Sequence, residues 1–218
     1  MLEYLIKSIL AYGLGGIMGG DVMRWLGGGA DLRSAGSGNV GATNALRTRG
    51  AKFALGVLLI DIGKGIAAVL LIPRLPWLGA TEASTQALLP YFCGYGVALG
   101  HCYPLFQRFR GGKGVATLTG VFAALLPALL PWLLITFLLM VMLTGYVSLA
   151  SITGSIVAVL AVGLFGAGFA SAAGIFTSAM LALVLFKHRQ NLARLWAGTE
   201  SRFEKARWLG RQIEKRWR

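Results

Sequence analysis

The sequence is poor in charge, and in acidic charge above all. Only 13% of its 218 residues are charged, and 8 Asp and Glu stand against 21 Lys and Arg, which gives a formal net charge of +13. Soluble globular domains carry about 25% charged residues. The shortage excludes an ordinary soluble domain.

Cysteine and histidine are also scarce, with two of each. Cys93 and Cys102 are nine positions apart on what should be one helix, too far along its axis for a disulfide, so we expect both to be packing residues. His101 and His188 are 87 positions apart, without a companion cysteine or acidic cluster. This pattern excludes a zinc site, and the sequence also lacks a serine nucleophile elbow.

Apolar residues are abundant. They make up 56% of the chain, and the mean hydropathy is +0.68. Runs of about 17 to 25 apolar residues recur, each long enough to cross the bilayer as a helix. We therefore predict an all-α integral membrane protein, a polytopic bundle of about seven transmembrane helices. The expected spans are 3–20, 53–73, 86–106, 115–131, 132–148, 151–168 and 171–187.

The basic residues predict the orientation. The loops 21–52 and 107–114 are rich in Lys and Arg, whereas the loop 74–85 has only Arg74 against Glu82. The positive-inside rule places the first two loops in the cytoplasm, with the N-terminus outside and the C-terminus cytoplasmic. Five spans would satisfy the same rule.

Residues 202–218 form a basic tail in which Phe203, Trp208, Leu209 and Ile213 alternate with cations. This pattern is typical of an amphipathic helix on a membrane surface, and a frayed, solvated end is the alternative. Because the positive charge lies in loops and in this tail, its expected partners are membrane lipid and an anionic substrate, and no nucleic acid.

Three polar blocks interrupt the apolar sequence. The first, GSGNVGATNALRTRG (36–50), combines glycines that let the backbone N–H groups turn outward with short polar side chains and a guanidinium. This composition suits a phosphate, although a glycine-rich turn before a helix is the alternative. Its candidate binding residues are Ser37, Gly38, Asn39, Thr43, Asn44 and Arg47.

The second block is GHCYPLFQRFRGGKGVAT (100–117). Its glycines and Lys113 precede an expected helix whose N-terminus could bind an anion. It is not a Walker motif, because Gln107 replaces the first glycine and Gly114 replaces the Ser or Thr. Cytoplasmic anchoring charges are the alternative. The candidate residues are His101, Gly111, Gly112, Lys113 and Gly114.

The third block is HRQNLARLWAGTES (188–201). On a continuing helix, His188, Asn191 and Arg194 share one face, although a histidine at a membrane edge can also be a simple hydrogen-bonding residue. Within the second span, Asp61 and Lys64 are three residues apart and should form an ion pair facing the bundle interior. The sequence leaves open whether this pair is structural or supports a site.

The three blocks together resemble the motifs of the bacterial acyl-phosphate:glycerol-3-phosphate acyltransferase family (PlsY), and YVSLASI (146–152) and DIGK (61–64) also match in place. The resemblance covers residues 10 to 201. One departure is GLGGIMGG, where Gly16 and Met18 stand in place of the family's Ser and Pro.

The resemblance implies a membrane acyltransferase domain (1–201), followed by the cytoplasmic tail. Its reaction would move a fatty acyl group from acyl phosphate to the 1-hydroxyl of sn-glycerol 3-phosphate, giving lysophosphatidic acid and phosphate. The expected place is the bacterial cytoplasmic (inner) membrane, with the site on the cytoplasmic side. An acyl phosphate has a good leaving group, so we expect no metal and no cofactor. The enzyme that produces acyl phosphate is a candidate partner.

The resemblance also implies residue roles. Ser37, Arg47 and Lys113 are assigned to the phosphates, and His188, Asn191 and Arg194 to orienting glycerol phosphate. Glu200 is expected to buttress one of the cations, and Ser151 is an extra contact. The proton acceptor stays open between His188, His101 and a substrate phosphate. A transporter for a phosphorylated solute is the alternative function, and a lipid-binding anchor would explain the tail but not the motifs.

Overall fold

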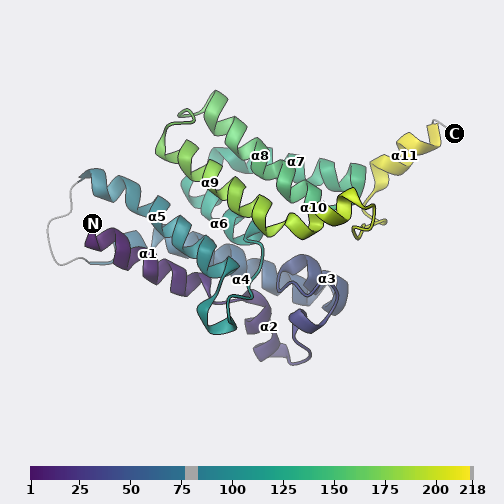
Figure 1. Ribbon diagram of the computed structural model, residues 1–218, viewed down its shortest axis with the longest axis horizontal. Coiled ribbons are helices and arrows are strands. Elements are labelled where there is room, and N and C mark those ends of the chain that lie inside the picture. Colours follow the sequence, from purple (N-terminus) through teal and green to yellow (C-terminus); the bar gives the residue numbers. More distant parts are fainter. Residues whose placement is uncertain (77–82, 217–218) are drawn as a thin grey trace. The chain divides into compact units, whose positions relative to one another are not determined.

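The computed structural model describes residues 1–76 and 83–216 and divides the chain into an N-terminal unit, Met1–Pro127, and a C-terminal unit, Ala128–Arg218. All regular elements in the described ranges are helices, as predicted (Figure 1). Glu82 and residues 217–218, which entered the loop and tail predictions, lie outside the described residues.

The N-terminal unit contains α1 (Leu2–Gly15), α2 (Gly19–Gly27), α3 (Ala42–Arg49), α4 (Ala51–Leu70), α5 (Ala83–Cys102) and α6 (Val115–Leu125), with short 3-10 turns at Leu32–Ser34, Ile72–Arg74 and Leu105–Gln107. A further 3-10 turn at Pro127–Leu129 lies where the two units join. The C-terminal unit contains α7 (Leu130–Thr144), α8 (Val147–Phe165), α9 (Ala172–Lys187), α10 (Arg189–Trp196) and α11 (Trp208–Arg216).

Glycines let helices of the N-terminal unit approach closely. Helices α1 and α5 lie side by side (Figure 1), and a Cβ atom added to Gly15 would lie 3.0 Å from the Cα atom of Gly100. On α4, a Cβ atom at Gly65 would meet the Thr117 carbonyl of α6. In a bilayer no hydrophobic force drives helices together, so they associate by close packing through small residues. The glycine-rich composition therefore serves the fold.

The exterior of the helices is apolar. Three helical stretches are long and apolar enough to cross a bilayer, namely Ala51–Arg74, Pro127–Thr144 and Val147–Phe165, and Val115–Leu125 and Ala172–Lys187 are shorter apolar helices. On α7, Trp132 and Leu138 expose 61% and 56% of their surfaces. Such a surface is stable in lipid rather than in water, which agrees with an integral membrane protein.

A helix overlaps each expected span, but only three helical stretches among the described residues are long and apolar enough to cross a bilayer, and several predicted boundaries were wrong. The first helix ends at Gly15, and α2 begins at Gly19, so the span 3–20 is broken in two. The fourth ends at Leu125, because Pro127 disfavours helical geometry at the residue before it. The expected third span runs only to Cys102, two residues before Pro104.

Two further boundaries differ. The expected loop 21–52 contains most of α2 and all of α3. The sixth span was expected from residue 151, but α8 begins at Val147, just after Gly145 ends α7 in the left-handed conformation. The two cysteines lie on α5 as predicted, and both are buried free thiols.

Candidate active site

Asn44 organises the first polar block. Its side chain is buried, Oδ1 accepts the Ser37 N–H over 2.9 Å, and Nδ2 lies within hydrogen-bonding distance of the carbonyls of Leu32, Ala35 and Asn39. These contacts occupy its polar atoms. We expected Asn44 to contact substrate, whereas the structure uses its side chain to fold the loop.

The other residues of this block divide between loop geometry and exposed groups. Gly38 has a φ of 71°, and its N–H donates to the Ala35 carbonyl. Asn39 accepts the Gly41 N–H over 2.9 Å, a contact typical of a turn. Ser37 and Arg47 are exposed, and Thr43 is half-buried. Ser37 and Arg47 are therefore the candidate side chains of this block that are exposed.

Arg33, which sequence reasoning missed, links the segment just before the first block to the second block. Its guanidinium donates to both Asp21 carboxylate oxygens over 2.6 and 3.0 Å and to Asp31, and its Nε donates to the Arg110 carbonyl over 3.2 Å. The hydrogen bonds from Arg33 to Asp21 raise the pKa of Arg33. For Asp31, burial raises the pKa, but the Arg33 backbone N–H and nearby guanidinium charges outweigh it and lower the pKa below 3.8. The only sequence signal was an arginine near two aspartates in a basic loop.

Within the second block, the glycine-rich segment packs on His101. The Gly112 N–H donates to the His101 carbonyl over 3.0 Å, and a Cβ atom at Gly112 would lie 2.9 Å from Cε1 of the His101 ring. A side chain at Gly111 would likewise meet Pro104. Gly114, with a φ of 84°, caps α6, so half-buried Lys113 lies just before the N-terminus of that helix. The N–H of Gly112 is thus engaged within the protein, whereas we had expected it to face a substrate.

Lys64 determines the protonation of the buried His101 ring. Its ammonium nitrogen lies 2.8 Å from Asp61 Oδ1, 2.8 Å from the Ile17 carbonyl and 2.8 Å from His101 Nδ1. An ammonium group has three protons and no lone pair, so each proton meets one acceptor and Nδ1 accepts. With Lys64 as an ammonium group, the neutral His101 ring carries its proton on Nε2. In this tautomer the lone pair of the ring is engaged by Lys64.

In the C-terminal unit, Glu200 holds the third block together. Its Oε1 accepts hydrogen bonds from Ser148 Oγ over 2.9 Å and Asn191 Nδ2 over 2.6 Å, and its Oε2 accepts from Arg194 Nε over 2.7 Å. Burial raises the pKa of Glu200, but these donors outweigh it and lower the pKa below 4.5. The predicted buttress is confirmed, with Asn191 as a second partner.

Ser148 was missed, although it lies three residues before Ser151 on the same face of α8. The Ser151 hydroxyl, which was predicted as a substrate contact, donates to the Val147 carbonyl of its own helix over 2.9 Å. The serine that reaches the third block is therefore Ser148.

His188 lies at the junction of two helices. It ends α9 and precedes α10, so the expected continuous helix is broken at this residue, while Asn191 and Arg194 share a face as predicted. The buried ring places Nδ1 2.9 Å from the Val184 carbonyl. A carbonyl only accepts, so Nδ1 carries the proton and the lone pair of the neutral ring is on Nε2. His188 thus has the tautomer that His101 lacks.

The described residues contain no group of three or more His, Cys, Asp or Glu side chains that could hold a metal ion. Blocks one and two lie in the N-terminal unit and the third in the C-terminal unit.

Comparison with known proteins identifies the family of the chain. The family profile described as "Glycerol-3-phosphate acyltransferase" matches residues 5–198. The glycerol-3-phosphate acyltransferase of Aquifex aeolicus is 40% identical over 202 residues, which cover 93% of this chain and 100% of that protein. The enzyme of the same name from Rhizobium meliloti is 39% identical over 194 residues, 89% of each chain.

Two solved structures are also similar. The crystal structure of PlsY, an integral membrane glycerol 3-phosphate acyltransferase, in its glycerol 3-phosphate form has a TM-score of 0.81 and 38% identity, covering 92% of this chain and 95% of that one. Its lysophosphatidic acid form has the same TM-score and 36% identity, covering 94% and 98%. This chain belongs to the glycerol-3-phosphate acyltransferase family of integral membrane enzymes.

Proposed function

We propose that the enzyme transfers a fatty acyl group from acyl phosphate to the 1-hydroxyl of sn-glycerol 3-phosphate, releasing lysophosphatidic acid and phosphate. The observation that carries the proposal is the hydrogen bond from Arg33 to the Arg110 carbonyl, which ties the segment just before the first glycine-rich block to the second block in a chain of this family. Both substrates carry phosphate, and two adjacent cationic loops suit two anions.

Ser37, Arg47 and Lys113 contact the phosphates in this proposal, and Asn191 and Arg194, both held by Glu200, orient glycerol phosphate. The acyl phosphate is a mixed anhydride, so positioning and charge neutralisation supply most of the acceleration without a covalent intermediate. The hydroxyl oxygen attacks the acyl carbon, and phosphate leaves.

His188 positions the attacking hydroxyl through Nε2. The proton of that hydroxyl passes to His188 or to a substrate phosphate. His101 is not the acceptor, because Lys64 occupies its Nδ1 lone pair.

The proposed arrangement in the membrane has seven spans, formed by α1 and α4 to α9, with the N-terminus outside. The polar blocks, the tail and the site then lie on the cytoplasmic side of the inner membrane, where Lys and Arg concentrate. Acyl phosphate reaches the site from the bilayer, and the enzyme that produces it is the proposed partner.

Purified protein in lipid nanodiscs tests the function. Incubation with palmitoyl phosphate and glycerol 3-phosphate should give lysophosphatidic acid and phosphate in equal amounts, whereas palmitoyl-CoA should give neither. Product from the thioester alone would contradict the proposed donor. Uptake of labelled glycerol 3-phosphate into proteoliposomes, without lysophosphatidic acid, would favour the transporter instead.

A further inference from the structure

A buried polar cluster lies beneath the second block and has no place in the mechanism above. It consists of Asp61 and Lys64 on α4 and His101 near the end of α5, whose side chains expose between 1% and 3% of their surfaces. The cluster joins chain segments that are remote in sequence. Besides the contacts of Lys64 with the Ile17 carbonyl and the His101 ring, Asp61 accepts the N–H of Gly19 at the start of α2.

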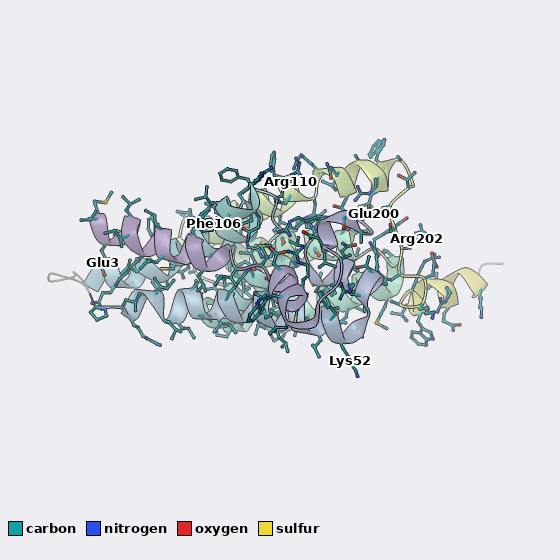
Figure 2. The ribbon with its side chains drawn as sticks, turned by 90° about the horizontal axis from the view of Figure 1, so that it is seen from below. Glu3, Lys52, Phe106, Arg110, Glu200 and Arg202 are labelled. Carbon is teal, nitrogen blue, oxygen red and sulfur yellow. The ribbon has the colours of Figure 1, made fainter. Side chains whose placement is uncertain are left out.

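A purely structural role explains this cluster poorly. Replacing a buried ion pair by apolar side chains is often neutral or stabilising, so such a pair is weak evidence of stability alone. The N-terminal unit has a second buried pair for comparison, Glu3 and Lys7 at 2.6 Å. Figure 2 shows Glu3 at the end of α1 remote from Arg110. Of these two buried pairs, Asp61–Lys64 is the one that contacts His101, which packs on Gly112.

The route from the cluster to the second block is short. Lys64 fixes the His101 ring through Nδ1, the far side of the ring packs against Gly112, and the His101 carbonyl accepts the Gly112 N–H. Lys113 is the next residue. A shift of the ring therefore shifts the backbone that carries the Lys113 ammonium group, which weakens the contact of that group with a bound phosphate.

We propose that Asp61, Lys64 and His101 are positioning residues, which hold the segment Arg110–Gly114 so that Lys113 meets a substrate phosphate. The proposal rests on the assignment of Lys113 to a phosphate in the proposed function. None of the three residues contacts substrate in it.

The kinetic test uses two matched double variants. Lys64→Met with Asp61→Asn removes both charges, so no buried charge is left unpaired, and Lys7→Met with Glu3→Gln does the same at the other pair. We expect the first variant to raise the KM of one phosphate substrate by about tenfold with kcat changed less than about threefold, and the second to leave both KM values unchanged. Equal kinetic effects in the two variants, or effects that only follow their melting temperatures, would overturn the proposal.

The histidine offers a rescue test. Asparagine places an amide oxygen near the position of Nδ1, whereas glutamine reaches the position of Nε2. His101→Asn keeps an acceptor for Lys64 and should retain a KM within about threefold of the native value, while His101→Gln should resemble the double variant Lys64→Met with Asp61→Asn. The reverse order would contradict the positioning role.

A measurement that needs no turnover separates this proposal from the proposed function. Gly112→Ala should lower the melting temperature of the native protein, because the methyl group meets the His101 ring. In a His101→Asn background, which lacks the outer ring atoms, the same change should cost much less. Additive effects would overturn the contact on which the proposal depends, even if no acyl transfer were found. If the effects couple but the native protein forms no lysophosphatidic acid, it is the function that fails.

Discussion

Asn191 donates its amide proton to the Glu200 carboxylate over 2.6 Å, across nine residues of the chain. Arg194 reaches the other carboxylate oxygen of the same side chain over 2.7 Å. One face of α10 is thereby tied to the segment that follows it. Two proposed substrate contacts consequently share a single anionic support.

Glu200→Gln should lower the melting temperature at neutral pH, by the equivalent of about 1 to 2 kcal/mol, because charge-assisted hydrogen bonds are lost. The pKa of Glu200 is below its usual 4.5 in the folded protein. The stabilisation is therefore complete above pH 4.5 and is lost as the pH falls through the folded pKa. Thermal unfolding of both proteins in detergent across this range should show the two curves converge in acid. A constant difference would contradict the assignment.

Ser148→Ala and Ser151→Ala form a matched pair on α8. Only the Ser148 hydroxyl donates to Glu200, whereas that of Ser151 donates within its helix. We expect Ser148→Ala to lower the free energy of unfolding by about 1 kcal/mol and to raise the KM for glycerol 3-phosphate several-fold. Ser151→Ala should change both quantities much less. Steady-state kinetics and melting temperatures check this order. A larger effect at Ser151 would restore the original prediction of a substrate contact there.

Asn44→Ala should open the first loop. Removal of the Asn44 amide leaves the Ser37 N–H and several carbonyls without their partner, which lowers the free energy of unfolding by about 2 to 3 kcal/mol. Hydrogen exchange over residues 32–44 should accelerate, and acyl transfer should fall with it. Asn39→Ala, which removes one turn contact from the side chain, is the control and should accelerate exchange less. Unchanged exchange in the Asn44 variant would show that the loop does not depend on this side chain.

His188 should respond in the opposite way to His101. Its Nδ1 is engaged by the Val184 carbonyl, so its function resides at Nε2. His188→Gln, which reaches that position, should therefore retain more activity than His188→Asn, and His188→Ala should lose at least about 100-fold. Rates across pH decide whether the ring also accepts a proton. If His101→Ala lost most activity while His188→Ala kept it, the assignment would be wrong.

Composition and the spacing of residues close in sequence were enough to predict the fold class and two ion pairs. Apolar runs gave an all-helical membrane fold, and the spacing of Asp61 and Lys64 gave a buried ion pair, which the structure confirms at 2.8 Å. The acidic support of the third block was also predicted, since Glu200 follows Arg194 closely in sequence.

Contacts between remote segments were not predictable in this way. The approach of Lys64 to His101 depends on how α4 packs against α5, and that of Arg33 to Arg110 on how two loops meet. The spacing of residues along the chain predicts neither of these two contacts. The predicted helix boundaries were wrong where a single residue ends a helix, as at Gly145, because hydropathy is averaged over many residues.

The three contacts of the Lys64 ammonium group also bear on its reactivity. A protonated amine whose hydrogens are all engaged presents no lone pair to an electrophile. While these three contacts hold, Lys64 is a poor nucleophile, and the acyl phosphate that we propose as the donor would not acylate it.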